Sequence, residues 1–259
     1  MIIKRDAYFT PAGKIRPLHI YLPEEYDRSD ESYPVMYFFD GHNLFSDSDA
    51  TYGKSWGLKT FLDRWPKPMI IVGIECGHEG RERLIEYCPY HFQTGFFGDL
   101  PGTGDATLRW MIEELKPMID REYRTQPFRE CTAIGGSSMG GLMSLYAAIR
   151  YNRWFSKAAC LSSAISPAMR GLIDDIDRSP LSADTRVYLS WGTEEAGGAA
   201  GSHSGDMATP TARNNLAIAD LLGAHAVHTR VYCQRGGRHC EADWEKQVPR
   251  FMNYLWLDQ

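Results

Sequence analysis

The sequence lacks the features that would place it among membrane, disulfide-bonded or nucleic-acid-binding proteins. No apolar run reaches the roughly 18 residues that a membrane-spanning helix needs. The formal net charge is −5 and basic residues alternate with acidic ones, so no basic stripe suits a nucleic acid. None of the six cysteines forms a close CxxC pair, which favours reduced thiols over a disulfide framework or a zinc site. We therefore expect no membrane, nucleic-acid or metal partner.

The amino terminus also lacks the apolar segment of a secretory signal, because charged residues follow directly after Met1-Ile2-Ile3. On this basis we expect a cytoplasmic protein. A length of 259 residues lies at the upper end for one domain, and no repeat or charged linker divides the chain. We expect a single domain over residues 1–259, in which the low-complexity segment 196–204 (AGGAAGSHS) forms a mobile loop.

Short apolar runs alternate with segments of helical periodicity along the chain. This alternation is typical of a mostly parallel central sheet flanked by helices on both faces, an α/β fold. Strands are predicted over Ile15–Leu22, Tyr33–Phe39, Met69–Ile74, Thr132–Gly135, Ala158–Leu161, Val187–Trp191 and Arg230–Cys233. Helices are predicted over Asp105–Tyr123, Met139–Tyr151, Thr211–Leu222 and Ala242–Leu257.

The segment 136–140 (GSSMG) fits the G-x-S-x-G pattern of a serine nucleophile. It lies between a predicted strand and a predicted helix, where a sharp turn would expose the hydroxyl of Ser138, and the flanking glycines leave room for that turn. A structural turn without function is the alternative. Ser137 lacks the glycine spacing and Ser144 lies inside the helix, so Ser138 is the predicted nucleophile.

A serine hydroxyl needs a neighbouring base, and in an α/β-hydrolase the chain order is serine, acid, histidine. His239 follows the last predicted strand and precedes the final helix, which favours it as the base. His203, His225 and His228 are the other histidines beyond Ser138. The acid should follow the strand 187–191; Glu194 and Glu195 both do, and Asp206 is a third candidate that residue pattern alone does not exclude.

Two backbone N–H groups should stabilise the oxyanion that forms during acyl transfer. Met139 follows the nucleophile, and His42 follows Asp40-Gly41 after an early strand, where the glycine lets the backbone bend. Trp56, Tyr52 and Glu86 are candidates for the substrate pocket, since a tryptophan offers a flat wall to an aromatic or sugar group.

Together these residues make the chain resemble the esterase family of α/β-hydrolases that includes esterase D, feruloyl esterases, enterochelin esterases, S-formylglutathione hydrolases and mycolyltransferases. The resemblance runs through nearly the whole chain and rests on several motifs in order. They are 38–45 (FFDGHNLF), 53–57 (GKSWG), 83–89 (RLIEYCP), 115–120 (LKPMID), 136–142 (GSSMGGL) and 237–241 (GRHCE).

The resemblance implies an esterase that works without a metal or organic cofactor. In this family the acid lies three residues after the glycine that follows the strand, which selects Glu195 over Glu194, although many relatives have aspartate there. The family's oxyanion donor follows Asp-Gly, which supports His42. We expect a carboxylesterase acting on a small-molecule ester of a small or aromatic acyl group; an acyltransferase with the same triad and a non-catalytic binding protein are the alternatives.

Overall fold

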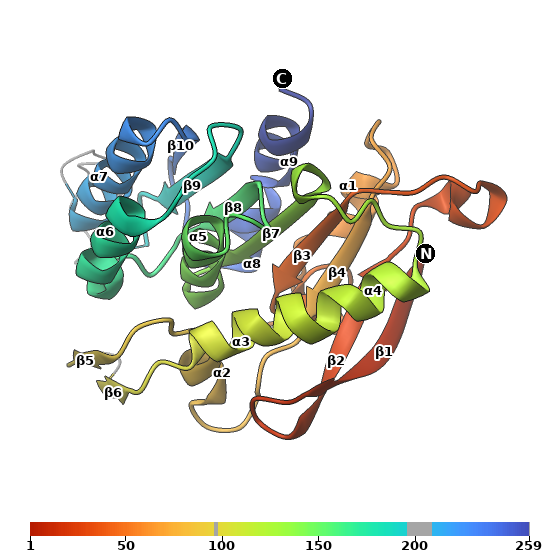
Figure 1. Cartoon of the computed structure of the whole chain (residues 1–259), viewed down its shortest axis with the longest axis horizontal. Helices are drawn as coiled ribbons and strands as arrows, with labels where there is room; N and C mark the ends of the chain where they lie inside the picture. The colour runs from red at the N-terminus through yellow and green to blue at the C-terminus, as the bar shows by residue number, and fades with distance from the viewer. Residues whose placement is uncertain (96–97, 196–208, 259) are drawn as a thin grey trace.

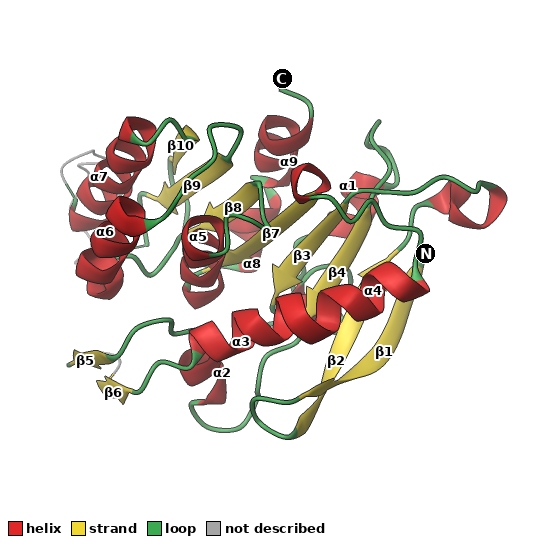
Figure 2. Ribbon diagram, viewed as in Figure 1, coloured by secondary structure: helices red, strands yellow, loops and turns green. Residues whose placement is uncertain are grey.

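The computed structural model describes residues 1–95, 98–195 and 209–258. Its centre is an eight-stranded sheet in the order β1-β2-β4-β3-β7-β8-β9-β10 (Figures 1 and 2). The pairs β1/β2 and β2/β4 are antiparallel and the remaining neighbours are parallel. The strands are β1 Ile2–Phe9, β2 Lys14–Tyr21, β3 Val35–Phe39, β4 Ile70–Ile74, β7 Thr132–Ser137, β8 Lys157–Leu161, β9 Arg186–Gly192 and β10 His228–Gln234. A separate ribbon pairs β5 Phe92–Thr94 with β6 Gly98–Leu100.

Helices cover both faces of this sheet (Figure 2). The α-helices are α1 Leu58–Leu62, α2 Glu82–Glu86, α3 Gly104–Trp110, α4 Lys116–Glu122, α5 Met139–Arg150, α6 Met169–Arg178, α7 Pro210–Ala224, α8 Glu241–Glu245 and α9 Val248–Trp256. Short 3₁₀ turns are η1 Glu24–Arg28, η2 Gly41–Asn43, η4 Arg129–Cys131 and η5 Ser166–Ala168, and η3 Met111–Leu115 is a π-helical segment between α3 and α4.

Two hydrophobic cores form because successive side chains of a strand point to opposite faces of the sheet. In β3, Tyr37 belongs to the core beneath α3 to α7, whereas Phe38 belongs to the core beneath α1, α8 and α9. The central strands are buried on both faces, which explains their nearly continuous apolar sequences. This packing fixes the carboxyl ends of β3, β7, β9 and β10, from which the loops of the site emerge.

The predicted α/β-hydrolase architecture is confirmed, with differences in detail. The predicted helix 105–123 is interrupted by the π-helical segment η3, and the predicted helix 242–257 divides into α8 and α9, with Pro249 in the first turn of α9. Strand β1 was not expected from the sequence. The loop 196–204 lies outside the described residues. Among the helices that are described, none is long and apolar enough to span a membrane.

Candidate active site

Ser138 lies at the turn from β7 into α5, with φ 58° and ψ −122°. A residue with a side chain adopts such a conformation only at a cost of about 1–3 kcal/mol, so the surrounding structure must hold it. Its N–H donates to the Leu161 carbonyl (2.9 Å) and its carbonyl accepts from Ala164 N (3.1 Å). A β-carbon on Gly136 would lie 2.8 Å from the Gly140 carbonyl, so the turn requires glycine there. The motif therefore has the strand–turn–helix context that a nucleophilic serine needs.

His239 and Glu195 meet beside this turn. His239 lies on the loop between β10 and α8, and Glu195 lies three residues beyond the end of β9. The distance from His239 Nδ1 to Glu195 Oε2 is 3.6 Å, and the Glu195 side chain is only 8% exposed. Glu194, by contrast, is exposed. The structure thus brings the carboxylate of Glu195 to the imidazole, in the arrangement in which an acid orients a catalytic histidine.

A chain of hydrogen bonds holds the Glu195 carboxylate in place. Its Oε1 accepts from the backbone N of Gly192 (2.7 Å) and from the hydroxyl of Ser162. That hydroxyl in turn accepts from the indole Nε1 of Trp244 (2.8 Å). The Trp244 ring also packs edge-on against the His239 ring, with centroids 5.1 Å apart. Ser162 and Trp244 together therefore position both Glu195 and His239.

Of the other candidates for the triad, Ser137 ends β7 and lines the same pocket as Ser138, and the rest lie elsewhere or outside the described residues. The Ser144 hydroxyl is buried and donates to the Gly140 carbonyl within α5. His225 lies near Asp177 (3.6 Å), and His228 begins β10 at the end of the strand opposite to His239. His203 and Asp206 fall within residues that the structure does not describe.

The two expected oxyanion donors both stand at the start of a helical turn. Met139 is the first residue of α5 and His42 is the second residue of η2, so their N–H groups have no acceptor within the helix. The bend before η2 occurs at Asp40, which has φ 57°. Our expectation that Gly41 makes this bend is wrong. Gly41 is needed instead because a β-carbon there would lie 2.3 Å from the Gly73 carbonyl carbon.

Arg83 holds Asp40, the residue of this loop whose backbone is in the left-handed conformation. Arg83 Nε and Nη2 each lie 2.7 Å from a different carboxylate oxygen of Asp40, a two-point ion pair. The Asp40 N–H donates to the Tyr87 hydroxyl (3.2 Å). The His42 ring is buried, which lowers the pKa of its imidazole, and its Nε2 lies 2.9 Å from Thr51 Oγ1. The loop that carries the His42 N–H is thus anchored from several sides.

Ser138 and His239 line one pocket of about 620 Å³, together with His42 and the strongly exposed Tyr52. Its remaining wall combines polar and charged residues with two glycines and a tryptophan: Asp40, Asn43, Thr51, Cys76, Gly77, His78, Gly80, Arg83, Ser137, Cys240, Glu241 and Trp244. Burial raises the pKa of Glu241 above its usual value. A pocket of this size lies within the range of small-molecule binding sites.

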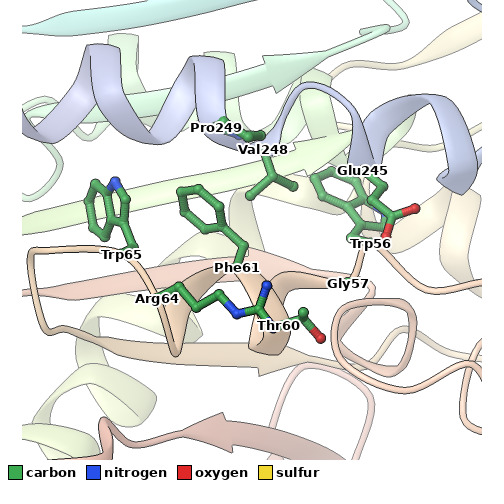
Figure 3. Close-up of a pocket in the computed structure, with 9 residues that line it drawn as sticks. All are labelled: Trp56, Gly57, Thr60, Phe61, Arg64, Trp65, Glu245, Val248 and Pro249. Atoms are coloured by element: carbon green, nitrogen blue, oxygen red, sulfur yellow. The ribbon is translucent and has the colours of Figure 1, made fainter.

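Two of the expected pocket residues do not line this pocket. Trp56 is 3% exposed and packs against Phe38 and Trp244 in the core. It borders a different pocket of about 390 Å³ between α1 and α9, which Figure 3 shows with Phe61, Trp65 and Val248. Glu86 is buried behind the pocket wall, where its carboxylate accepts from Arg16 Nη2 (2.6 Å) and Gly77 N (2.9 Å). Its role is to hold the loop at Gly77.

Sequence reasoning did not find Ser162, Trp244 or Arg83. Ser162 follows β8, and the carboxyl ends of parallel strands gather at one edge of the sheet, so its position was a usable signal. Arg83 begins the segment 83–89 that carried part of the resemblance, but nothing in that segment indicates Asp40 as its partner. The pairing depends on tertiary structure alone.

Comparisons with known proteins identify the family of the chain. The family described as "Putative esterase" matches residues 12–254. The chain belongs to this esterase family. It is accordingly an enzyme, a serine hydrolase that acts on ester bonds.

The individual relatives have low sequence identity to the chain. The chain is 27% identical to YbbA of Bacillus subtilis, an uncharacterized protein, over 70% of this chain and 69% of that one. It is also 27% identical to esterase Rv1288 of Mycobacterium tuberculosis, over 58% of this chain but only 29% of that protein. An IroE-like serine hydrolase from Shewanella oneidensis shares the fold with a TM-score of 0.76 at 21% identity, covering 97% of this chain and 79% of that one.

Proposed function

We propose that this esterase is a serine carboxylesterase in which Ser138 is the nucleophile, His239 the general base and Glu195 the acid that orients it. The observation that carries the proposal is the placement of Glu195 beside His239 at the pocket that contains the strained Ser138. Strained non-glycine residues persist only where the surrounding structure holds them, and they cluster at functional sites.

The reaction follows from the roles of these groups. Ser138 Oγ attacks the ester carbonyl carbon while His239 takes its proton, and the backbone N–H groups of Met139 and His42 stabilise the oxyanion. The carbon–oxygen bond to the alcohol then breaks, and His239 returns the proton to the leaving alcohol. Water, activated by the same imidazole, attacks the acyl-enzyme and releases the carboxylic acid.

The polar wall of the pocket supports an acyl group that is small or aromatic and carries polar substituents. Polar side chains such as Asn43 and Thr51 line the pocket and can form hydrogen bonds with such substituents. The exposed ring of Tyr52 is available to stack on an aromatic acyl or alcohol group at the mouth of the pocket.

The test is hydrolysis of p-nitrophenyl acetate and of a feruloyl ester by the wild type and by the Ser138→Ala variant. The proposal predicts free acid as the product, also with excess alcohol present, and loss of turnover in the variant. An acyl-alcohol product would identify a transferase instead. Unchanged turnover in Ser138→Ala would remove the nucleophile assignment, and absence of turnover with every ester would favour a binding protein.

A further inference from the structure

Three metal-binding side chains converge on the wall of the pocket outside the proposed triad. His42, Cys76 and His78 each offer a ligand atom, and these atoms lie within 4.8 Å of one another. The Cys76 Sγ and His78 Nδ1 atoms are 4.0 Å apart. A tetrahedral Zn²⁺ with ordinary bond lengths would place its sulfur and nitrogen ligands about 3.6 Å apart. A movement of about 0.4 Å would bring this pair to that spacing, and the ligand atoms of the other two pairs lie at most 4.8 Å apart.

The hydrogen bonds of both histidines leave the correct nitrogen available. The Glu75 carboxylate can only accept, so the Nε2 of His78 that it contacts at 2.9 Å carries the proton and Nδ1 remains a lone-pair donor. In His42, Nε2 lies 2.9 Å from the Thr51 hydroxyl, which can accept the Nε2 proton and so leave the lone pair on Nδ1. The Nδ1 of His42 is fully buried and has no hydrogen-bond partner among the described residues. A buried polar atom without a partner is costly, and a bound ligand would satisfy it.

The surroundings of the cluster also favour a cation. A carboxylate that holds the far nitrogen of a histidine ligand is the usual outer partner in zinc sites, and Glu75 has this relation to His78. The Glu75 carboxylate also lies 2.7 Å from His19 Nε2, so the group that holds His78 is itself held in place.

We propose that His42, Cys76 and His78 bind one borderline-soft divalent cation such as Zn²⁺, and that the bound ion inhibits the esterase reversibly. Sequence reasoning missed the site because its cysteine and histidines are not in a recognisable spacing. On binding, the ion forms a bond to Cys76 Sγ, and the thiol proton passes to the solvent. Two imidazoles and a thiolate leave a fourth position for water.

Inhibition follows from the position of the cluster and rests on the proposed function. The ion and its water would occupy space in the pocket that the ester must enter, because all three ligands line the same cavity as Ser138. The positive charge would also oppose formation of the His239 imidazolium during acylation. Binding itself does not depend on the esterase chemistry, so the two claims are testable separately.

The experiment titrates the metal-free protein with zinc chloride by calorimetry and with Co²⁺ by absorption spectroscopy, and measures ester hydrolysis at each zinc concentration. We expect one ion per chain, release of a proton and a thiolate-to-cobalt charge-transfer band. Cys76→Ser and His78→Ala should each raise the dissociation constant at least about 10-fold, with an equal loss of zinc sensitivity relative to each variant's own activity. Circular dichroism should confirm that both variants are folded.

Matched controls are Cys131→Ser and His228→Ala, since Cys131 directly precedes β7 and His228 begins β10, both away from the pocket. These should bind zinc as the wild type does. No binding, or binding that Cys76→Ser leaves unchanged, would overturn the site. Binding at the site without inhibition would overturn the inhibitory role. If the protein hydrolysed no ester, the proposed function would fail while the calorimetric and cobalt results still decided the metal site.

Discussion

Replacing Glu195 with glutamine tests the proposed acid directly. The amide has nearly the shape of the carboxylate and keeps an oxygen that can accept from Gly192 N and Ser162, but it carries no charge. It can also turn an NH₂ group toward His239 Nδ1, which would impose the wrong tautomer on the imidazole. The Glu195→Gln variant should therefore fold normally and lose activity.

The separation of the two groups sets the size of the effect. At 3.6 Å between Nδ1 and Oε2, a carboxylate stabilises an imidazolium by about 4–5 kcal/mol with an effective dielectric constant of about 20. The His239 side chain is 42% exposed, so water screens the interaction, and the lower value is the ~1 kcal/mol of an exposed ion pair. These energies correspond to a fall in kcat/KM between about 5-fold and about 2,000-fold.

The assay is steady-state hydrolysis of p-nitrophenyl acetate, with thermal unfolding to verify the fold. The matched control is Glu194→Gln, which removes the same charge from an exposed neighbour and should change kcat/KM by no more than about two-fold. The reasoning is refuted if Glu194→Gln loses activity to the larger extent, or if Glu195→Gln retains that of the wild type.

Three further substitutions have defined outcomes. Ser162→Ala removes the hydroxyl that donates to Glu195, and it should lower kcat about 10-fold with little change in KM; unchanged kcat would mean that the Gly192 N–H suffices. The lysine of Arg83→Lys cannot form the two-point ion pair with Asp40, so kcat should fall about 10-fold while the far-ultraviolet circular dichroism spectrum stays unchanged. Full activity would show that the loop does not need the two-point ion pair. Burial lowers the pKa of Lys157 from its ordinary 10.5 to about 8, so the unfolded chain binds more protons between these pH values and stability rises with pH across them. Lys157→Met should raise the free energy of unfolding at pH 7 by about 1 kcal/mol and abolish that rise, as urea unfolding at pH 7 and pH 10 would reveal; a destabilised variant would contradict the argument.

The features that sequence predicted well are local ones. The turn at Ser138 was predictable because a strand, a glycine-flanked serine and a helix follow one another within a few residues, and each obeys a simple steric rule. Strand β4 was predictable because a strand buried on both faces has a continuous apolar sequence. In β1, by contrast, exposed and partly buried charges interrupt the pattern on an edge strand, and its pairing with β2 decides the structure.

The features that sequence did not predict depend on which side chains meet in space. Trp56 has the same residue type whether it lines a pocket or a core, and only its contacts with Phe38 and Trp244 place it in the core. The bond from Trp244 to Ser162 joins residues 82 positions apart in the chain. Glu195 was selected by its spacing in a family of esterases; the structure places it 3.6 Å from His239, and its role as the acid remains a proposal for kinetics to test.

The most direct test of the account is covalent labelling of the nucleophile. The wild type would be treated with a fluorophosphonate, which reacts with activated serines, and the modified residue located by peptide mass spectrometry. The account predicts one label per chain on Ser138, loss of ester hydrolysis in proportion to labelling, and neither label nor turnover in Ser138→Ala. Labelling at another serine, or continued hydrolysis by Ser138→Ala, would contradict it.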